Sequence, residues 1–277
     1  MSNFRKWIEY VEILTAVLVT ALVLKLFVVD AVKVQSGSME STVLPGDVIL
    51  VNKLSYGLRA SGFPFSRASF PLSIFPRLGT VSRGDVVVFR FPSDSDEPVI
   101  YVKRCVGLGG DTISIRDGVI LVNGLAMRRG KQLLPPQYSR EYTDGRLFPR
   151  SEKQNLDFYG PLRVPKRGDA IPLSVGNYSE WEQLIRAEGH SIARTTDEEI
   201  MIDGKPARMY AIEKNYLFVL GDNFYHSCDS RFWGFVPENN LIGEASLVYW
   251  SADPERHPGS VFDIRSIRWN RLGRFIR

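Results

Sequence analysis

The run Ser36-Gly37-Ser38-Met39 contains two serines whose hydroxyls are candidates for nucleophilic chemistry. A serine hydroxyl becomes an effective nucleophile only when a neighbouring base takes its proton. Gly37 has no side chain, so a substrate backbone can approach Ser38 closely. The same run is common in ordinary loops, and it therefore indicates a candidate nucleophile without identifying a base.

Lys103 is the stronger candidate for the base, and His226 is the weaker one. Lys103 interrupts the apolar run of residues 99–106. The alternation of a strand puts it on the same face as Tyr101, and burial on an apolar face lowers the pKa of a lysine, as a neutral amine base requires. The alternatives are a solvent-facing lysine and a triad that includes His226 and Asp229.

The elements that must position these residues begin with an apolar segment, residues 10–30, just before the serines. Roughly 20 apolar residues at ~1.5 Å per residue match a hydrocarbon core of ~30 Å, which predicts a transmembrane helix. Arg5 and Lys6 lie in residues 1–9, which favours a short cytoplasmic N-terminus and a catalytic part across the membrane. A cleaved signal peptide has the same basic stretch and apolar core and is the alternative.

Short apolar runs separated by turn residues follow this segment and predict a mainly β fold. They are rich in β-branched and aromatic residues and cover residues 48–51, 86–91, 99–106, 112–115, 119–122, 216–220 and 245–250. Hairpin turns are predicted where glycine supplies a positive φ, at Asp117-Gly118, Asn123-Gly124 and Asp203-Gly204. One helix is predicted over residues 179–188, with Ser179 as N-cap and with Trp181, Leu184 and Ile185 on one face.

The polar, irregular stretch of residues 128–208 divides the predicted β core. We expect an antiparallel β-sheet catalytic core formed by residues 31–127 and 209–277, with residues 128–208 as an inserted smaller β-rich subdomain. The hydrophobic content of 44% and the aromatic content of 12% are typical of a chain that buries a core.

Composition argues against several classes of function. A net charge of +4 over 277 residues argues against nucleic acid as a partner. Two cysteines exclude a disulfide framework, and with only three histidines a structural zinc site is improbable, so we expect no metal and no cofactor. The C-terminal segment carries arginines at every third position, interspersed with aromatic residues. These arginines are Arg265, Arg268, Arg271, Arg274 and Arg277. The segment is either a basic tail in solvent or a contact for anionic lipid headgroups.

Four strings in order carry a resemblance to a known family: QSGSMESTVLPGDVILVNK, RGDVVVF, YVKRCVGLGGDTI and GDNFYHSCDSRFWGFVP. They resemble the blocks of type I signal peptidases, membrane-bound Ser-Lys proteases that cleave leader peptides from exported proteins. The similar blocks cover most of residues 10–125 and 210–250, and the apolar segment before them agrees with the family pattern.

The resemblance implies a role for each matched residue. Ser38 corresponds to the nucleophile and Lys103 to the general base, which takes the serine proton and later gives it to the departing amine. The backbone N–H of Ser38 and the hydroxyl of Ser36 correspond to the oxyanion hole, and Ser227 to the serine that hydrogen-bonds the lysine nitrogen.

Further positions correspond to supporting and substrate-binding residues. Asp229 and Arg231 match a supporting ion pair, while Asp222 and Asn223 belong to the turn that holds their loop against the site. The walls of small pockets, which would select Ala-x-Ala cleavage sites, are matched by Val34, Met39, Tyr101 and Val102.

The chain departs from the family pattern at three places. Ser41 stands where a proline is usual, which implies a looser turn after the nucleophile, and Gln35 replaces a frequent proline before Ser36. Phe224-Tyr225-His226 replaces a run that is commonly similar to Arg-Asp-Asn. These departures bear on specificity more than on the type of reaction.

The leading hypothesis is a membrane-anchored serine endopeptidase that removes N-terminal signal peptides from exported precursor proteins. We expect a single span in the cytoplasmic (inner) membrane and a catalytic domain on its extracytoplasmic side. One alternative is a Ser-Lys peptidase specialised for a pilin or a conjugation component. A self-cleaving repressor also uses serine and lysine on a similar β core, but it is soluble and has a DNA-binding segment. A non-enzymatic membrane-anchored β module is the remaining alternative.

Two more hypotheses concern residues outside the dyad. Cys105 lies two residues beyond Lys103 and Cys228 directly follows Ser227, so a disulfide between them would couple redox state to the base. Residues 63–77 carry Phe63, Phe65, Phe70, Ile74 and Phe75 among prolines and arginines, which predicts either a loop that enters the membrane interface or ordinary core packing.

Overall fold

The structure, a computed structural model, describes residues 2–56, 79–91, 99–127, 136–150, 153–195, 198–256 and 264–277. It is mainly β, with antiparallel sheets and an N-terminal apolar helix, which confirms the predicted fold class. The chain forms two compact units. The first comprises Met1–Val34, Gly46–Thr80 and Ile242–Ile276, and the second comprises Gln35–Pro45, Val81–Leu241 and Arg277.

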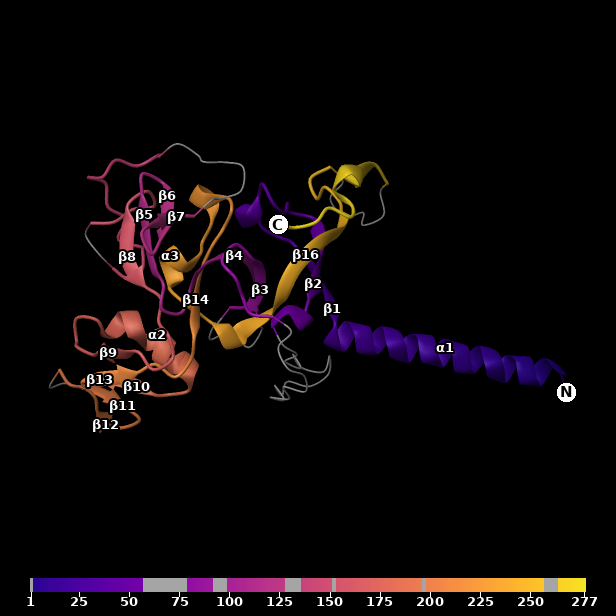
Figure 1. Cartoon of the computed structure of the whole chain (residues 1–277), viewed down its shortest axis with the longest axis horizontal. Helices are drawn as coiled ribbons and strands as arrows, with labels where there is room; N and C mark the ends of the chain where they lie inside the picture. The colour runs from indigo at the N-terminus through magenta and orange to yellow at the C-terminus, as the bar shows by residue number, and fades with distance from the viewer. Residues whose placement is uncertain are drawn as a thin grey trace. The chain divides into compact units, whose positions relative to one another are not determined.

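The first unit begins with α1 (Ser2–Phe27), drawn as one continuous helix in Figure 1. Its part from Lys6 to Phe27 is long and apolar enough to cross a membrane, and its large apolar side chains from Trp7 to Leu24 are exposed. The helix ends three residues before the predicted boundary, because β1 (Val29–Lys33) follows at once.

Three paired strands of the largest sheet follow α1 in the same unit. Their order is β1-β2-β16, with β2 (Asp47–Asn52) in the centre and β16 (Leu241–Ser251) beside it. Buried and half-buried side chains alternate strictly along β2, as expected for a strand with one covered face. The remaining elements of the unit are the short turns η2 (Leu54–Tyr56), η5 (Ile264–Ser266) and η6 (Trp269–Arg271).

A buried ion pair fixes the C-terminal segment within this unit. The guanidinium of Arg271 donates to the carboxylate of Asp47, with Nη2 to Oδ2 at 2.6 Å, and Ser251 Oγ donates to the same carboxylate. Arg271 is therefore structural, whereas Trp269 beside it is 63% exposed. The arginines of the predicted basic tail do not share one environment.

The second unit contains a strand series of order β3-β4-β14-β15. These strands are β3 (Val86–Arg90), β4 (Ile100–Leu108), β14 (Tyr216–Leu220) and β15 (Val236–Pro237). Every side chain of β14 is buried, because both faces of this strand are covered. The pairing of β14 with β4 shifts register between Phe218 and Val219.

Smaller sheets complete the second unit. One has the order β7-β6-β5-β8, with β5 (Thr112–Arg116), β6 (Val119–Val122), β7 (Leu125–Ala126) and β8 (Tyr159–Arg163). Another joins β10 (Ile192–Arg194), β11 (Ile200–Ile202) and β12 (Lys205–Pro206), and a third pairs β9 (Ala170–Pro172) with β13 (Met209–Ala211). Residues 128–208, predicted as an insertion, all fall within this unit.

The helices and turns of the second unit are η1 (Gly37–Met39), α2 (Tyr178–Glu188), η3 (Phe224–His226), α3 (Ser230–Trp233) and η4 (Glu238–Asn240). The prediction of a helix near residues 179–188 is confirmed, with Leu184 and Ile185 buried on one face. The predicted N-cap, Ser179, is wrong because the helix already begins at Tyr178. Gly189 ends α2 with a φ of 101°, a left-handed conformation that glycine adopts without strain.

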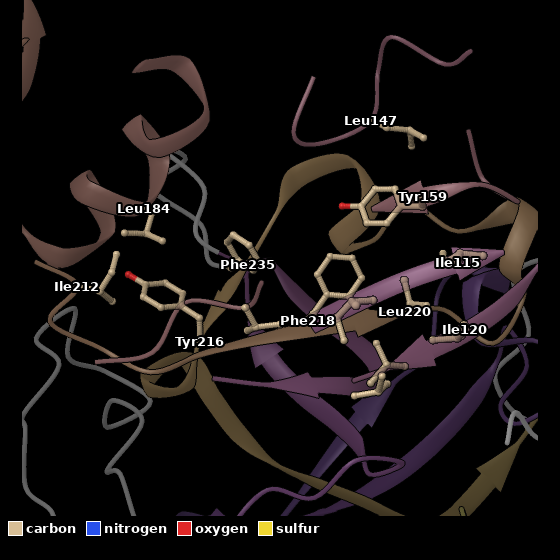
Figure 2. Close-up of a cluster of buried hydrophobic side chains, with 14 of the residues drawn as sticks. Ile115, Ile120, Leu147, Tyr159, Leu184, Ile212, Tyr216, Phe218, Leu220 and Phe235 are labelled. Carbon is tan, nitrogen blue, oxygen red and sulfur yellow. The ribbon is translucent and has the colours of Figure 1, made fainter. Parts of the chain in front are cut away.

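An aromatic core holds this unit together. Phe218 and Phe235 contact each other edge to face, and Tyr159 packs on Phe218 from β8 (Figure 2). The predicted hairpin turns are confirmed, since the first residue and the glycine of each pair have positive φ: Asp117-Gly118, Asn123-Gly124 and Asp203-Gly204.

Candidate active site

The two residues that the sequence singles out as nucleophile and base lie in contact within the second unit. Ser38 is in the middle of η1, and Lys103 is on β4. Lys103 Nζ donates to Ser38 Oγ at 2.5 Å. Only 4% of Lys103 is exposed, so the alternative of a solvent-facing lysine is excluded. The amine also lies 5.8 Å from the ring centre of Tyr101, on the face that strand alternation predicts.

Burial sets the protonation behaviour of Lys103. The pKa of its ammonium is lowered, mainly because burial removes water from the charged form. The carboxylates of Asp229 and Asp222 act in the opposite direction, and the guanidinium of Arg231 adds to the lowering. A lowered pKa increases the fraction of neutral amine, which is the form that can accept a proton from Ser38.

Ser36 stands beside the dyad. Its Oγ lies 3.3 Å from Ser38 Oγ, and its side chain is exposed. A hydroxyl in this position can turn toward an oxygen that develops charge next to Ser38, as an oxyanion donor must.

The loop of residues 221–231 holds the backbone of the candidate nucleophile. The backbone N–H of Asn223 donates to the carbonyl of Ser38 at 3.1 Å, and its side-chain amide donates to the carbonyl of Gly37 at 3.0 Å. Gly221 has no room for a side chain, because a Cβ would lie 2.4 Å from the Ser38 carbonyl and 2.1 Å from Ser227 Oγ. The backbone of η1 is therefore fixed by direct contact with this loop.

Arg104 is a residue of this site that the sequence reasoning missed. It forms two hydrogen bonds to Asp222, with Nε to Oδ1 at 2.8 Å and Nη2 to Oδ2 at 2.7 Å. Thr42 donates to the same carboxylate at 2.5 Å. Strand β4 thus carries the candidate base, Lys103, and on the next residue the cation that contacts Asp222 of the loop. The sequence signal that could have identified Arg104 is a second charge, directly after Lys103, within an apolar run.

Asp229 and Arg231 form a fully buried ion pair. Arg231 donates from Nε and Nη2 to the two carboxylate oxygens at 2.8 Å each, and Asp229 also caps α3 by accepting from the N–H of Arg231. The backbone N–H of Gly221 donates to the same carboxylate at 3.0 Å, so the pair closes the loop. Asp229 is thus engaged by Arg231, and His226 faces Asn223 instead, which leaves no triad of His226 with Asp229.

The environment of Ser227 differs from the one that the resemblance implies. Its side chain is 5% exposed, and its Oγ has no hydrogen-bond partner among the described residues. The hydrogen bond to Lys103 that the resemblance implies is therefore not formed in this structure. The position is nevertheless close to the dyad, because Ser227 and the Ser38 carbonyl meet the same face of Gly221.

The residues expected to line substrate pockets have different environments. Met39 is 1% exposed, and its sulfur accepts the backbone N–H of Asp222 at 3.4 Å. Tyr101 and Val102 are half-buried on β4. Val34 is buried within the first unit, where its N–H donates to the carbonyl of Asp47.

The two cysteines are both free thiols. Cys105 is buried, which raises its pKa, and its thiol donates weakly to the carbonyl of Gly107. Cys228 is exposed, and partial burial of its thiol raises its pKa as well. The structure therefore contains no bond between them. The aromatic stretch of residues 63–77 lies outside the described residues.

Comparison with known proteins identifies similar chains. A family model described as signal peptidase, peptidase S26, matches residues 7–250. The chain is 29% identical to signal peptidase I of Pseudomonas aeruginosa over 90% of its own length and 74% of that protein. It is 31% identical to signal peptidase I of Pseudomonas fluorescens, with the same coverage of 90% and 74%. For signal peptidase I of Aquifex aeolicus the identity is 27%, over 91% of this chain and 88% of the relative.

Proposed function

Because the chain belongs to the signal peptidase family, peptidase S26, and is therefore a hydrolase that processes signal peptides, we propose that Ser38 is its nucleophile and Lys103 its general base. The observation that carries this assignment is the hydrogen bond between Lys103 Nζ and Ser38 Oγ, made by an amine whose pKa burial lowers. The dyad needs no histidine, since a neutral amine has the lone pair that a base requires.

The reaction follows from this geometry. Neutral Lys103 takes the proton of Ser38 as Oγ attacks the carbonyl carbon before the cleavage site. The backbone N–H of Ser38 and the hydroxyl of Ser36 stabilise the resulting oxyanion, each by about 3 kcal/mol. Protonated Lys103 then gives its proton to the leaving amine, and water, activated by the same lysine, hydrolyses the acyl-enzyme.

The substrates are precursor proteins that carry signal peptides with small residues at the cleavage site, of the Ala-x-Ala type. We assign the pocket walls to Met39, Tyr101 and Val102. Half-buried side chains beside the dyad support a narrow apolar pocket at Tyr101 and Val102. An extended substrate that pairs with a strand would place alternate side chains into such pockets.

Membrane anchoring by α1 completes the proposal. The helix is long and apolar enough to span a bilayer, and its apolar side chains are exposed. Arg5 and Lys6 before the span favour a cytoplasmic N-terminus, so the catalytic part lies on the extracytoplasmic side of the cytoplasmic membrane. Ser38 follows the helix by only 11 residues, so the chain itself tethers the proposed nucleophile to the membrane.

Cleavage of a precursor by the purified full-length protein in detergent tests these assignments, with the cut site read by mass spectrometry. Ser38→Ala and Lys103→Ala are each expected to abolish cleavage while they leave the circular dichroism spectrum intact. Ser114→Ala, on β5, is the matched serine control and is expected to retain full activity. Full activity of either dyad variant would exclude the dyad. Cleavage of several unrelated precursors distinguishes a general enzyme from one specialised for a pilin or a conjugation component.

A further inference from the structure

Asp157 is a buried carboxylate whose hydrogen bonds connect residues 128–208 to the loop of residues 221–231. Its exposed fraction is 0%, and a carboxylate in such a place needs donors to offset the loss of water. Oδ2 accepts from the backbone N–H groups of Gln137 and Tyr138 at 2.7 and 2.8 Å. Oδ1 accepts from the phenol of Tyr225 at 2.6 Å. One carboxylate oxygen therefore binds the backbone of residues 137 and 138, and the other binds Tyr225 of the loop.

Tyr225 lies between the two parts of this loop that act on the dyad. Two residues before it, Asn223 holds the carbonyl of Ser38. Two residues after it begins the run 227–229, in which Cys228 and Asp229 act electrostatically on Lys103, as do Asp222 and Arg231 of the same loop. The turn that contains Tyr225, η3, is only three residues long and has no side-chain cap. Contacts from outside the turn must therefore fix its position.

Aromatic packing fixes the rings of this turn without fixing the phenol of Tyr225. The Phe224 ring is buried under the guanidinium of Arg231, whose carbon lies 4.0 Å from the ring centre. The Tyr225 ring meets Phe224 edge to face at 5.0 Å and Tyr138 at 6.1 Å. Replacement of Tyr225 by phenylalanine thus keeps the ring contacts and removes the hydrogen bond from the phenol to Asp157.

We propose that Asp157 and Tyr225 are positioning residues of the peptidase, which hold the loop of residues 221–231 so that Lys103 stays buried beside Ser38. The proposal rests on the dyad assigned above and gives residues 128–208 a part in catalysis. When the phenol is lost, the loop loosens and water reaches the amine. Because burial is the main cause of the lowered pKa of Lys103, that pKa then rises toward its ordinary value and less neutral amine is present at a given pH.

The experiment compares Tyr225→Phe with Tyr210→Phe in the full-length protein in detergent. Tyr210 provides a matched control, because its phenol donates to another buried carboxylate, Glu188, at 2.5 Å. Active sites are counted with a serine-directed acylating probe, so that unfolded protein does not contribute to kcat. Both variants are expected to lower the thermal midpoint.

Only Tyr225→Phe is expected to change catalysis. Its kcat should fall about tenfold, with KM within about twofold, because the substrate contacts are unaltered. The acidic limb of its kcat profile should move to higher pH, whereas Tyr210→Phe keeps the profile of the parent enzyme. Asp157→Asn combined with Tyr225→Phe should have the kcat of the slower single variant, since both act through one bond.

Three outcomes would overturn the proposal: a kcat and pH profile of Tyr225→Phe equal to those of the parent, equal losses of kcat in Tyr225→Phe and Tyr210→Phe, or additive losses in the double variant. Failure of the proposed function gives a different result, because the parent enzyme itself would then not cleave precursors or would cleave them without Ser38. The two proposals are therefore judged on separate measurements.

Discussion

Gly221 offers a direct test of the steric argument for the site. A Cβ on this residue would lie 2.4 Å from the Ser38 carbonyl oxygen and 2.1 Å from Ser227 Oγ. Carbon and oxygen atoms that are not bonded approach to about 3.3 Å, so the carbonyl in Gly221→Ala must retreat by about 0.9 Å. Rotation of the Ser227 side chain can move its Oγ away, but Ser227 Cβ would also lie 2.4 Å from the new Cβ and does not move with that rotation. The Ser38 carbonyl belongs to the backbone of η1, which carries the proposed nucleophile.

The expected loss follows from this displacement. Misplacement of a reacting group by about 1 Å costs about 100-fold in rate, which corresponds to about 2.7 kcal/mol of activation free energy. Overpacking should lower the free energy of unfolding by about 1–3 kcal/mol, so that the variant remains folded at 25 °C if the parent has ordinary stability.

The assay is kcat on a precursor peptide, with the rate of Ser38 acylation by a serine-directed probe and the thermal midpoint measured on the same samples. Gly145→Ala is the matched control, because nothing lies within 4 Å of its Cβ position and its φ is not positive. It should behave as the parent. Activity of Gly221→Ala within about twofold of the parent would refute the claim that this glycine sets the position of η1.

Three other changes test separate parts of the structure. Lys103→Met should raise the free energy of unfolding at pH 7, because the pKa of the lysine is lower in the folded than in the unfolded protein; denaturant titrations should show this gain shrinking as pH rises toward 10.5, the ordinary pKa. Ser41 has a φ of 89°, so Ser41→Gly should stabilise the protein by about 1 kcal/mol and Ser41→Pro should destabilise it by about 3 kcal/mol or more, as measured by chemical denaturation; the reverse order would contradict the assigned backbone. Arg271→Ala leaves the buried carboxylate of Asp47 without its cation and should cost about 3–5 kcal/mol of unfolding free energy, whereas the exposed Arg274→Ala should stay within about 0.5 kcal/mol; equal thermal midpoints would show that the buried pair is not structural.

Local patterns predicted the local structure well. Short runs rich in β-branched and aromatic residues predicted the strands, and Asp-Gly or Asn-Gly pairs predicted the hairpin turns, because both depend on residues adjacent in sequence. The start of α2 was misplaced because Ser179 and Asn177 are both acceptable caps, and sequence alone does not choose between them. At Ser41 the sequence suggested a looser turn, since a proline is usual there in the family pattern. The structure adds that the φ of Ser41 is positive, a conformation that proline cannot adopt.

Contacts between distant residues could not be predicted from those patterns. The role of Arg104 depends on Asp222, which lies 118 residues away, and no local sequence pattern around either residue predicts that the two are in contact. The steric role of Gly221 likewise becomes visible only when the Ser38 carbonyl is placed against it. Lys103 was an exception, because a charge within an apolar strand is unusual enough to be noticed in one sequence.

The separation of these contacts along the chain has a consequence during synthesis. The hydrogen bond from Asn223 to Gly37 joins residues 186 positions apart, and that from Thr42 to Asp222 joins residues 180 apart. A ribosome adds about 5–20 residues per second, so η1 waits on the order of ten seconds or more before the loop that fixes it exists. A nascent chain therefore contains the proposed nucleophile and the proposed base several seconds before the loop that fixes η1 has been synthesised.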